Sequence, residues 1–219
     1  MGNILAIISH PDDETFGCGG TLALHATKGH DVGVLCLTCS PSERRSELER
    51  AVSILGVDEP IIFPEERLAG GSETIRRISD VIVERRPEVV LTHLPFDYHR
   101  EHRLAHELVK EAVEWAAHTT TYEEPWLVER LLLVEINTLI PTPQVLVDIS
   151  DVYDLKAEAI EAYKSQVAKF DWRYYQRFDR SKAELRGVQG NCGFAEAFME
   201  DMLPRNSSFY TEKATRSLF

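Results

Sequence analysis

A histidine and three acidic residues stand together near the N-terminus, in the segment His10-Pro11-Asp12-Asp13-Glu14. Three adjacent carboxylates repel one another unless a cation or hydrogen bonds offset their charge. Imidazole and carboxylate groups are also the ligands that zinc commonly takes in proteins. A single acid at this place would fit a helix cap. Four titratable groups in five positions instead favour a metal or acid–base site.

A second group of titratable residues runs from His93 to His102 and includes His99 and Glu101. His10, one carboxylate and one of these histidines would supply three ligands, the usual number for a catalytic zinc that keeps one position open for water. These spacings do not decide which of the histidines and carboxylates would bind the metal. His102 and His106, four residues apart on one helix face, could chelate a metal by themselves. His93 fits better as a pocket wall.

The segments before these two groups predict where they lie. Asn3–Ser9 and Pro87–Leu94 are short apolar runs, which predict strands buried on both faces. In open α/β sheets, ligands bind at the carboxyl edge of the strands. If the two strands are neighbours, the two groups of side chains face each other across one cleft.

The rest of the chain alternates between strand-like and helix-like segments, which predicts an α/β fold with a doubly wound, mostly parallel sheet. Further strands are expected at 31–38, 60–63, 130–137 and 143–149, and helices at 21–28, 42–55, 74–85, 101–117, 152–165 and 181–189. Residues 10–20 are expected to form a loop. We find no linker, and we therefore expect one domain over 1–219, with a core at about 1–120 and a smaller C-terminal portion at about 121–219.

The amino-acid composition limits which molecules the protein is expected to bind. The formal charge of −12 repels phosphate backbones and anionic lipid headgroups, so neither a nucleic acid nor a membrane is expected as a partner. The N-terminus has neither the basic lead nor the cleavage site of a signal peptide. Four irregularly spaced cysteines suit free thiols in a reducing compartment. We therefore expect a cytoplasmic protein.

The two groups of residues, in this order, resemble the signature of the LmbE-like, or PIG-L-type, N-acetylglucosaminyl deacetylases. That signature is HPDDE after the first strand and a later D-x-H-x-D-H loop, which here reads Asp97-Tyr98-His99-Arg100-Glu101-His102. The resemblance extends over nearly the whole chain. Its other segments are 44–47, 147–150, 156–157, 163–166, 186–187 and 195–198.

The resemblance implies a Rossmann-like fold and a zinc-dependent amidase site. It implies that His10, Asp13 and His102 hold the metal. It also implies that Asp12 is the general base and that His99 steadies the tetrahedral intermediate or protonates the leaving amine.

Two further residues are implicated by their places in the matching segments. Glu101 stands where the family usually has aspartate, and we expect it to act in catalysis by pairing with His99. Arg44 is a candidate substrate-binding residue, and the alternative is a surface arginine paired with Glu43 or Glu47.

The expected reaction is hydrolysis of the acetamide of an N-acetylglucosamine-containing small molecule to a free amine and acetate. The expected cofactor is Zn²⁺, with Fe²⁺ or another divalent metal as the alternative. Other readings are an amidase for a bulkier amide such as a thiol S-conjugate, and a non-catalytic metal-binding member. A non-haem iron oxygenase would also use two histidines and one carboxylate, but it would leave Asp12 without a role. A homo-oligomer is expected because family members commonly assemble.

Overall fold

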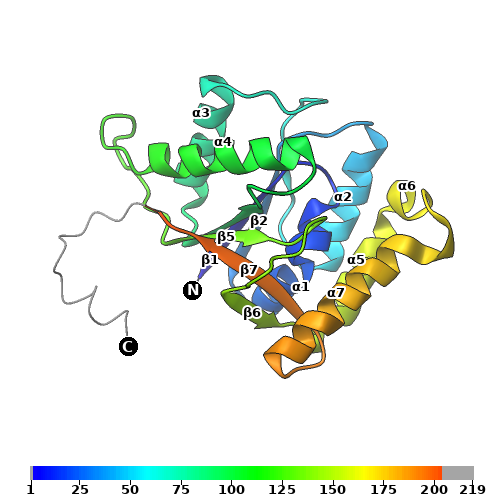
Figure 1. Cartoon of the computed structure of the whole chain (residues 1–219). Coiled ribbons are helices and arrows are strands. Elements are labelled where there is room, and N and C mark those ends of the chain that lie inside the picture. The colour runs from blue at the N-terminus through cyan, green and yellow to red at the C-terminus, as the bar shows by residue number, and fades with distance from the viewer. Residues whose placement is uncertain (1, 204–219) are drawn as a thin grey trace.

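The computed structural model describes residues 2–203, and their centre is a seven-stranded sheet in the order β3-β2-β1-β4-β5-β7-β6 (Figure 1). The first five strands in this order run parallel to one another. The strands are β1 (Asn3–Ile8), β2 (Asp31–Cys36), β3 (Ile61–Ile62), β4 (Val89–His93), β5 (Arg130–Val134), β6 (Val145–Asp148) and β7 (Ala195–Asp201). This arrangement confirms the expected α/β fold with a mostly parallel sheet.

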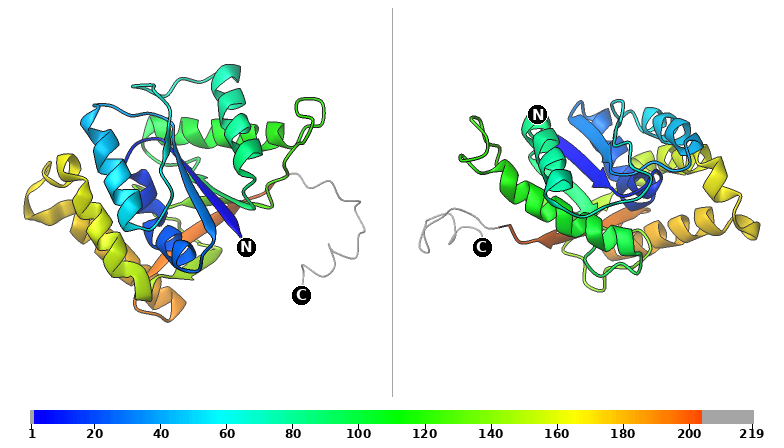
Figure 2. Two further views of the ribbon diagram at one scale, coloured as in Figure 1. Left: turned by 180° about the vertical axis from the view of Figure 1, so that it is seen from behind. Right: turned by 90° about the horizontal axis from the view of Figure 1, so that it is seen from above.

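Helices cover both faces of the sheet (Figures 1 and 2). Helices α3 and α4 pack on one face, and α1, α2 and α5 pack on the other. The α-helices are α1 (Asp13–Thr27), α2 (Glu43–Ile54), α3 (Ser72–Arg85), α4 (Arg100–Ala116), α5 (Tyr153–Ala162), α6 (Lys164–Val167) and α7 (Tyr174–Gly190), with short 3₁₀ helices η1 (Ser150–Val152) and η2 (Asp171–Arg173).

Strand β1 is apolar throughout because both of its faces are buried. Ile4, Ala6 and Ile8 point into the core beneath α1 and α2, whereas Leu5 and Ile7 point into the core beneath α3 and α4. Successive side chains alternate between the faces of a strand, and both faces are covered here. A polar residue at any of these positions would therefore lose contact with water.

The order of the strands places a switch point between β1 and β4. From β1 the chain moves outward through β2 to β3, and from β4 it moves outward in the opposite direction to β5. Crossover connections therefore diverge at the carboxyl ends of β1 and β4, which leaves a crevice where open α/β sheets bind ligands. Both groups of titratable residues follow these two strands.

The prediction of a loop over residues 10–20 is wrong, because α1 begins at Asp13. Two glycines of this helix allow close packing. A Cβ atom on Gly17 would lie 2.8 Å from Cγ2 of Val134, and one on Gly20 would lie 2.6 Å from Cδ1 of Ile149. These contacts bring α1 close to β5 and to the segment that follows β6.

The C-terminal portion completes the same sheet. The sequence analysis did not predict β7, which lies between β5 and β6 and pairs with both in antiparallel register. Helix α7 also begins at Tyr174, seven residues before the predicted 181. Residue 1 and residues 204–219 of the expected domain lie outside the described residues.

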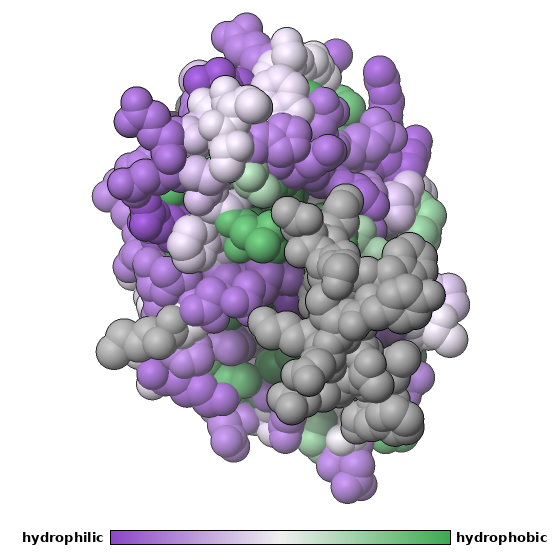
Figure 3. Space-filling model, turned by 90° about the vertical axis from the view of Figure 1, so that its left-hand side faces the viewer, coloured by the Kyte–Doolittle hydropathy of each residue, from purple (hydrophilic) through white to green (hydrophobic). Residues whose placement is uncertain are grey.

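The surface is largely polar. Hydrophilic residues predominate on the coloured part of the face in Figure 3, in keeping with the charge of −12. Within residues 2–203, no helix is both long enough and apolar enough to cross a bilayer.

Candidate active site

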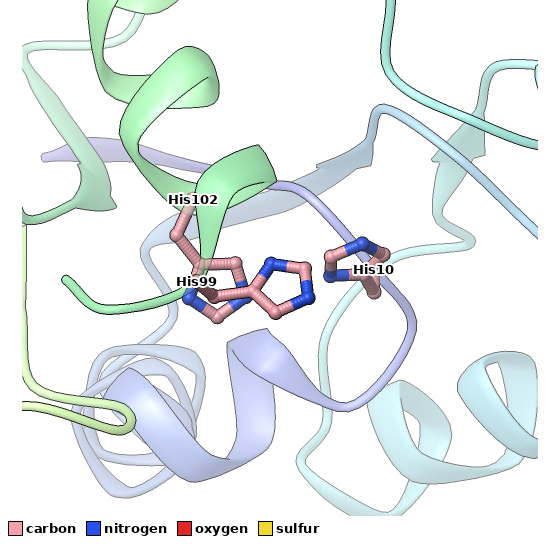
Figure 4. Close-up of side chains that lie close together, drawn as sticks. All are labelled: His10, His99 and His102. Atoms are coloured by element: carbon pink, nitrogen blue, oxygen red, sulfur yellow. The ribbon is translucent and has the colours of Figure 1, made fainter.

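The two groups of side chains meet at the carboxyl ends of β1 and β4. His10 comes from the turn after β1, while His99 and His102 come from the first turn of α4 (Figure 4). The ring centroid of His10 lies 5.0 Å from that of His99 and 5.4 Å from that of His102. The fold therefore brings together histidines about ninety positions apart in the chain.

Asp13 lies between two of these histidines. Its Oδ2 is 3.2 Å from Nδ1 of His10, and its Oδ1 is 3.2 Å from Nε2 of His102. A tetrahedral zinc with bonds of about 2.0–2.1 Å holds its ligand atoms about 3.3 Å apart. Both contacts of Asp13 are close to this spacing. The ligand atoms of two groups, His10 with His99 and His102, and Asp13 with His93 and His102, lie within 4.8 Å of one another, so side chains of this cluster could hold a divalent metal.

A second carboxylate lies behind each of these histidines. Asp97 Oδ1 is 3.4 Å from Nδ1 of His102, and Glu101 Oε2 is 2.7 Å from Nε2 of His10. Metal-binding histidines usually donate their other ring N–H to a carboxylate or carbonyl, which fixes the ring orientation. Each histidine is thus held with one nitrogen towards Asp13, as a metal site requires.

Glu101 therefore does not pair with His99 as the sequence analysis expected. Its side chain, one methylene longer than that of aspartate, reaches from α4 to His10 on the opposite side of the cleft. His99 is therefore left without Glu101 as a partner. Its Nδ1 atom is buried and has no hydrogen-bond partner among residues 2–203.

Two other histidines have different surroundings. The backbone N–H of Ser9 donates to Nε2 of His93 at 2.8 Å, which occupies the lone pair that a metal would need. His93 thus lines the wall of the site, although it lies near Asp13 and His102. His106 pairs with Asp201, with a distance of 2.8 Å from Nε2 to Oδ2.

Asp12 has an unusual backbone conformation and a partly buried side chain. Its φ angle of 109° lies in a region that favours glycine, with aspartate among the more tolerated exceptions. Arg44 Nη2 lies 2.7 Å from Asp12 Oδ2 and also donates to the carbonyl of Pro11. Arg44 thus contacts neither Glu43 nor Glu47. It holds the turn that carries Asp12 and lines the cleft beside it.

The two adjacent aspartates differ in their protonation. Burial and the neighbouring Asp13 raise the pKa of Asp12 well above its usual value, and Arg44 opposes this only in part. Burial would also raise the pKa of Asp13, but His102 and His10 overcome that effect and lower it. Asp13 is therefore the more readily ionised of the two, and Asp12 is the stronger base.

The pKa values of His102 and His99 differ as well. Burial would lower the pKa of His102, yet Asp13 and Asp97 raise it to about 10. Burial and the positive charge of His102 instead lower the pKa of His99. Without a metal, His102 is therefore protonated at neutral pH. Burial would lower the pKa of His10 too, but Asp13 and Glu101 raise it.

These residues form one end of a cleft of about 530 Å³. The other end is aromatic. The cleft is lined by His10, Asp12, Asp13, Phe16, Arg44, Tyr98, His99, His102, Ile136, Asn137, Gln166, Lys169, Phe170, Tyr174, Tyr175 and Phe178.

A buried ionic cluster behind the site was not predicted from the sequence. It consists of Lys156, Asp179, Lys182 and Glu196, each at most 6% exposed. Lys156 Nζ lies 2.9 Å from Asp179 and 2.8 Å from Glu196. Lys156 and Glu196 fall in segments that match the family signature, and this was their only signal in the sequence.

The ionic cluster contacts a break in α1. Cys18 leaves helical geometry there, with φ at −150°. Glu196 accepts hydrogen bonds from the N–H groups of Gly20 and Thr21, at 2.9 and 2.7 Å, and Lys182 donates to the carbonyl of Phe16 at 2.8 Å. The polar groups that the break frees are thus satisfied by buried charges.

Comparisons with known proteins agree with this geometry. The PIG-L family, described as GlcNAc-PI de-N-acetylase, matches residues 5–113. A diacetylchitobiose deacetylase of Thermococcus kodakarensis is 30% identical over 88% of this chain and 80% of its own. A 4-oxalmesaconate hydratase of Pseudomonas putida is 28% identical over 88% of this chain and 83% of its own.

A solved structure extends the similarity to the fold. A conserved protein from Thermus thermophilus is 31% identical, with a TM-score of 0.84 over 97% of this chain and 100% of its own. The chain therefore belongs to the PIG-L, or LmbE-like, family of de-N-acetylases, which are amide hydrolases.

Proposed function

We propose that this protein is a divalent-metal-dependent N-deacetylase that hydrolyses the acetamide of an N-acetylglucosamine-containing small molecule. The products are the free amine and acetate. The observation that carries the proposal is the position of Asp13 between His10 and His102, with the more basic Asp12 beside it in the same cleft. The similarity to a diacetylchitobiose deacetylase supports an amino-sugar substrate.

His10, Asp13 and His102 are the residues that would hold the metal, with Zn²⁺ proposed and Fe²⁺ or another divalent ion as the alternative. When bound, such an ion polarises a carbonyl and makes water more acidic. Asp97 and Glu101 keep the two histidines in place by accepting hydrogen bonds from their far nitrogens.

Asp12 acts as the general base. Its carboxylate removes a proton from the attacking water, and its raised pKa makes it better suited to this step than an ordinary aspartate. Arg44 holds one carboxylate oxygen at 2.7 Å, which leaves the other free to face the water. Asp13 cannot share this role because its charge is already engaged by two histidines.

His99 acts at the opposite side of the acetamide. Its place on the cleft wall suits a group that pairs with substrate. It would donate a hydrogen bond to the developing oxyanion, and the proton that Asp12 removes from water would pass through His99 to the leaving nitrogen as the C–N bond breaks.

The charges of the cleft favour deacetylation over the hydratase activity named for the relative from Pseudomonas putida. That relative's substrate is a polycarboxylate, which requires cationic partners. Of the two cations on the cleft wall, Arg44 pairs with Asp12, and Lys169 donates to the side chain of Gln166 at 2.5 Å. Among the described residues of the cleft wall, only Lys169, whose partner is neutral, is left to pair with an anion, which suits an uncharged amide better than a substrate with several carboxylates. A bulkier amide, such as a thiol S-conjugate, is the main alternative.

Acetate release tests the proposal. The zinc-loaded protein is incubated with N-acetylglucosamine, its disaccharide, and its malate and inositol conjugates, and acetate is measured with and without a chelator. We expect release from at least one compound, lost with the chelator and lost in Asp12→Asn. The exposed Asp151 provides a matched control, and Asp151→Asn should retain activity. Release of a bulkier acyl group alone, or hydration of a polycarboxylate, would contradict the proposal.

We also propose a cellular compartment and an oligomeric state for the protein. Its four cysteines are all free, which supports a reducing, cytoplasmic environment. We further propose a homo-oligomer, supported by the exposed Leu185 and Val188 on α7. Light scattering on the purified protein would measure its mass directly, and a monomer at micromolar concentration would refute this.

A further inference from the structure

Glu14 is the one acid of the segment 10–14 that has no role in the proposed chemistry. Its side chain is fully buried and does not line the cleft, so it cannot contact a substrate there. Burying a carboxylate costs free energy unless hydrogen bonds compensate for the lost water. The groups that donate to Glu14 therefore indicate what it stabilises.

Three donors meet the carboxylate of Glu14. Its Oε2 accepts a hydrogen bond from the backbone N–H of Asp12 at 3.1 Å. Its Oε1 accepts hydrogen bonds from the hydroxyl groups of Thr15 and Tyr163. Tyr163 is also fully buried, at the point where α5 ends and α6 begins. Burial and the charge of Glu14 raise the pKa of Tyr163, so its hydroxyl stays neutral and can donate.

The N–H of Asp12 belongs to a peptide group that is held at both ends. The carbonyl of the same group, that of Pro11, accepts a hydrogen bond from Arg44. The φ angle of Asp12 sets this peptide group against the rest of the residue, and its value of 109° is uncommon for residues other than glycine. Such a conformation persists only where the surrounding contacts fix it. Without the bond to Glu14, the peptide group would be free to rotate at its N–H end.

We propose that Glu14, held in turn by Tyr163, is a positioning residue that fixes the backbone of Asp12 and so directs the Asp12 carboxylate towards the water it deprotonates. Glu14 and Tyr163 act through Asp12 and touch no reacting atom. This inference rests on the proposed deacetylase function, in which Asp12 is the general base. A general base must lie within hydrogen-bond reach of the proton that it removes.

Substitutions of Glu14 separate its hydrogen bond from its charge. Glu14→Met has a side chain of similar length but offers the N–H of Asp12 no oxygen, so kcat should fall about 10–10²-fold, as a displaced catalytic group would cause. Glu14→Gln keeps one oxygen for that N–H and can turn its NH₂ group to the hydroxyls of Thr15 and Tyr163, which can also accept. Its kcat should therefore stay within about threefold of the wild-type value. In both variants KM and the zinc content should be unchanged.

Replacing Tyr163 tests the second part of the proposal. Tyr163→Phe keeps the ring and removes the hydroxyl, so kcat should fall about three- to tenfold at unchanged KM. Tyr122→Phe is the matched control, because the hydroxyl of Tyr122 also donates to a carboxylate, that of Asp80 at 2.6 Å, but does not line the cleft. That variant should keep the wild-type kcat. Wild-type kcat in Glu14→Met or in Tyr163→Phe would overturn the inference.

Hydrogen exchange of the Asp12 amide, followed by NMR in the metal-free protein, tests the contact without any measurement of activity. The amide should exchange about tenfold faster or more in Glu14→Met than in the wild-type protein, and at the wild-type rate in Glu14→Gln. The amide of Leu91 on the central strand β4 serves as the reference for general stability. If Glu14→Met accelerates both amides equally, Glu14 has only a structural role and the inference is wrong.

The possible failures are distinguishable. Absence of acetate release by the wild-type protein would refute the deacetylase function, and exchange of the Asp12 amide would still test the contact with Glu14. Acetate release that Glu14→Met reduces only through a lower zinc content, or through a higher KM, would leave the deacetylase function intact. It would show that Glu14 supports the metal or the cleft rather than Asp12, and would overturn the inference.

Discussion

Asp12 and Asp13 are neighbours in the chain but differ sharply in their surroundings. Asp13 lies between two histidines, which stabilise its charge. Asp12 has a left-handed backbone conformation, and its partly buried side chain pairs with a single arginine. Environments that push the pKa values of two acids apart assign them different roles. In the proposed mechanism, Asp13 is a metal ligand and Asp12 is the general base.

Replacing Asp12 by asparagine should separate these roles. Asp12→Asn keeps the size of the side chain but removes the base, so kcat should fall about 10²–10⁴-fold. The metal content of the purified variant, measured by atomic emission, should stay at the wild-type level because the three proposed ligands are untouched. A variant that loses its metal would show that Asp12 is itself a ligand.

Metal binding should release a proton. In the metal-free protein the pKa of His102 is about 10, so His102 carries a proton at pH 7.5. A metal can bind only the neutral ring. Calorimetric titration with zinc in buffers of different ionisation enthalpy should therefore show at least one proton released, and zinc affinity should rise as the pH increases from 7 towards 10. Heats that do not depend on the buffer would disprove this protonation state.

At the level of helices and strands, the break in α1 links the turn that carries His10 and Asp12 to the C-terminal half of the chain. Phe16 ends the first part of α1, and its carbonyl accepts a hydrogen bond from Lys182 of α7. Glu196 of β7 caps the second part at Gly20 and Thr21. The direction of the first part, which presents Asp13, thus depends on charges supplied by distant elements.

Replacing Lys182 by methionine should disturb both stability and the metal site. Lys182 donates to the buried carbonyls of Phe16 and Glu135, and each lost bond to a buried group costs about 1–3 kcal/mol. Burial and the nearby Lys156 lower the pKa of Lys182 to about 8, so the test is made at pH 7, where Lys182 is mostly protonated. We expect Lys182→Met to lower the free energy of unfolding in urea and to weaken zinc binding at least tenfold.

A control of similar instability distinguishes positioning from general damage. Leu48 is fully buried on α2, and Leu48→Ala should cost about 2–5 kcal/mol. It should bind zinc as the wild-type protein does. If both variants lose zinc affinity equally, the ionic cluster has no specific role in positioning the metal site.

At the scale of the whole molecule, the N-terminal core and the C-terminal portion share one sheet. Strand β7 pairs with β5 and with β6, β5 pairs with β4 of the core, and α5 packs against both α1 and α2. We infer that the described residues unfold as one unit rather than as two domains.

Unfolding measurements test this inference. Far-ultraviolet circular dichroism and tryptophan fluorescence should give coincident urea transitions, because Trp115 lies in the N-terminal core and Trp126 and Trp172 lie in the C-terminal portion. Zinc at one hundred times its dissociation constant should add about 2.7 kcal/mol to the free energy of unfolding. Two separated transitions would indicate two independent domains.

Much of this arrangement follows from the sequence alone. The apolar runs of β1 and β4 predict buried parallel strands, and the acids and histidines directly after them predict a site at the carboxyl edge. These predictions succeed because they depend on local order: a strand that ends at Ile8 necessarily places His10 at the sheet edge.

Other features were decided only by the tertiary structure. The helix that begins at Asp13 was predicted as a loop, and the partners on which its glycines pack, Val134 and Ile149, lie far away in the sequence. The partner of Glu101 was misassigned for the same reason, since its side chain reaches across the cleft to His10. For Arg44 the structure excludes the alternative of an ion pair along its own helix, because it pairs with Asp12. The aromatic side chains of the cleft and the ionic cluster likewise come from segments that are distant in the chain. Local patterns determine where an element begins and which face it buries, whereas contacts between distant elements depend on how the whole chain packs.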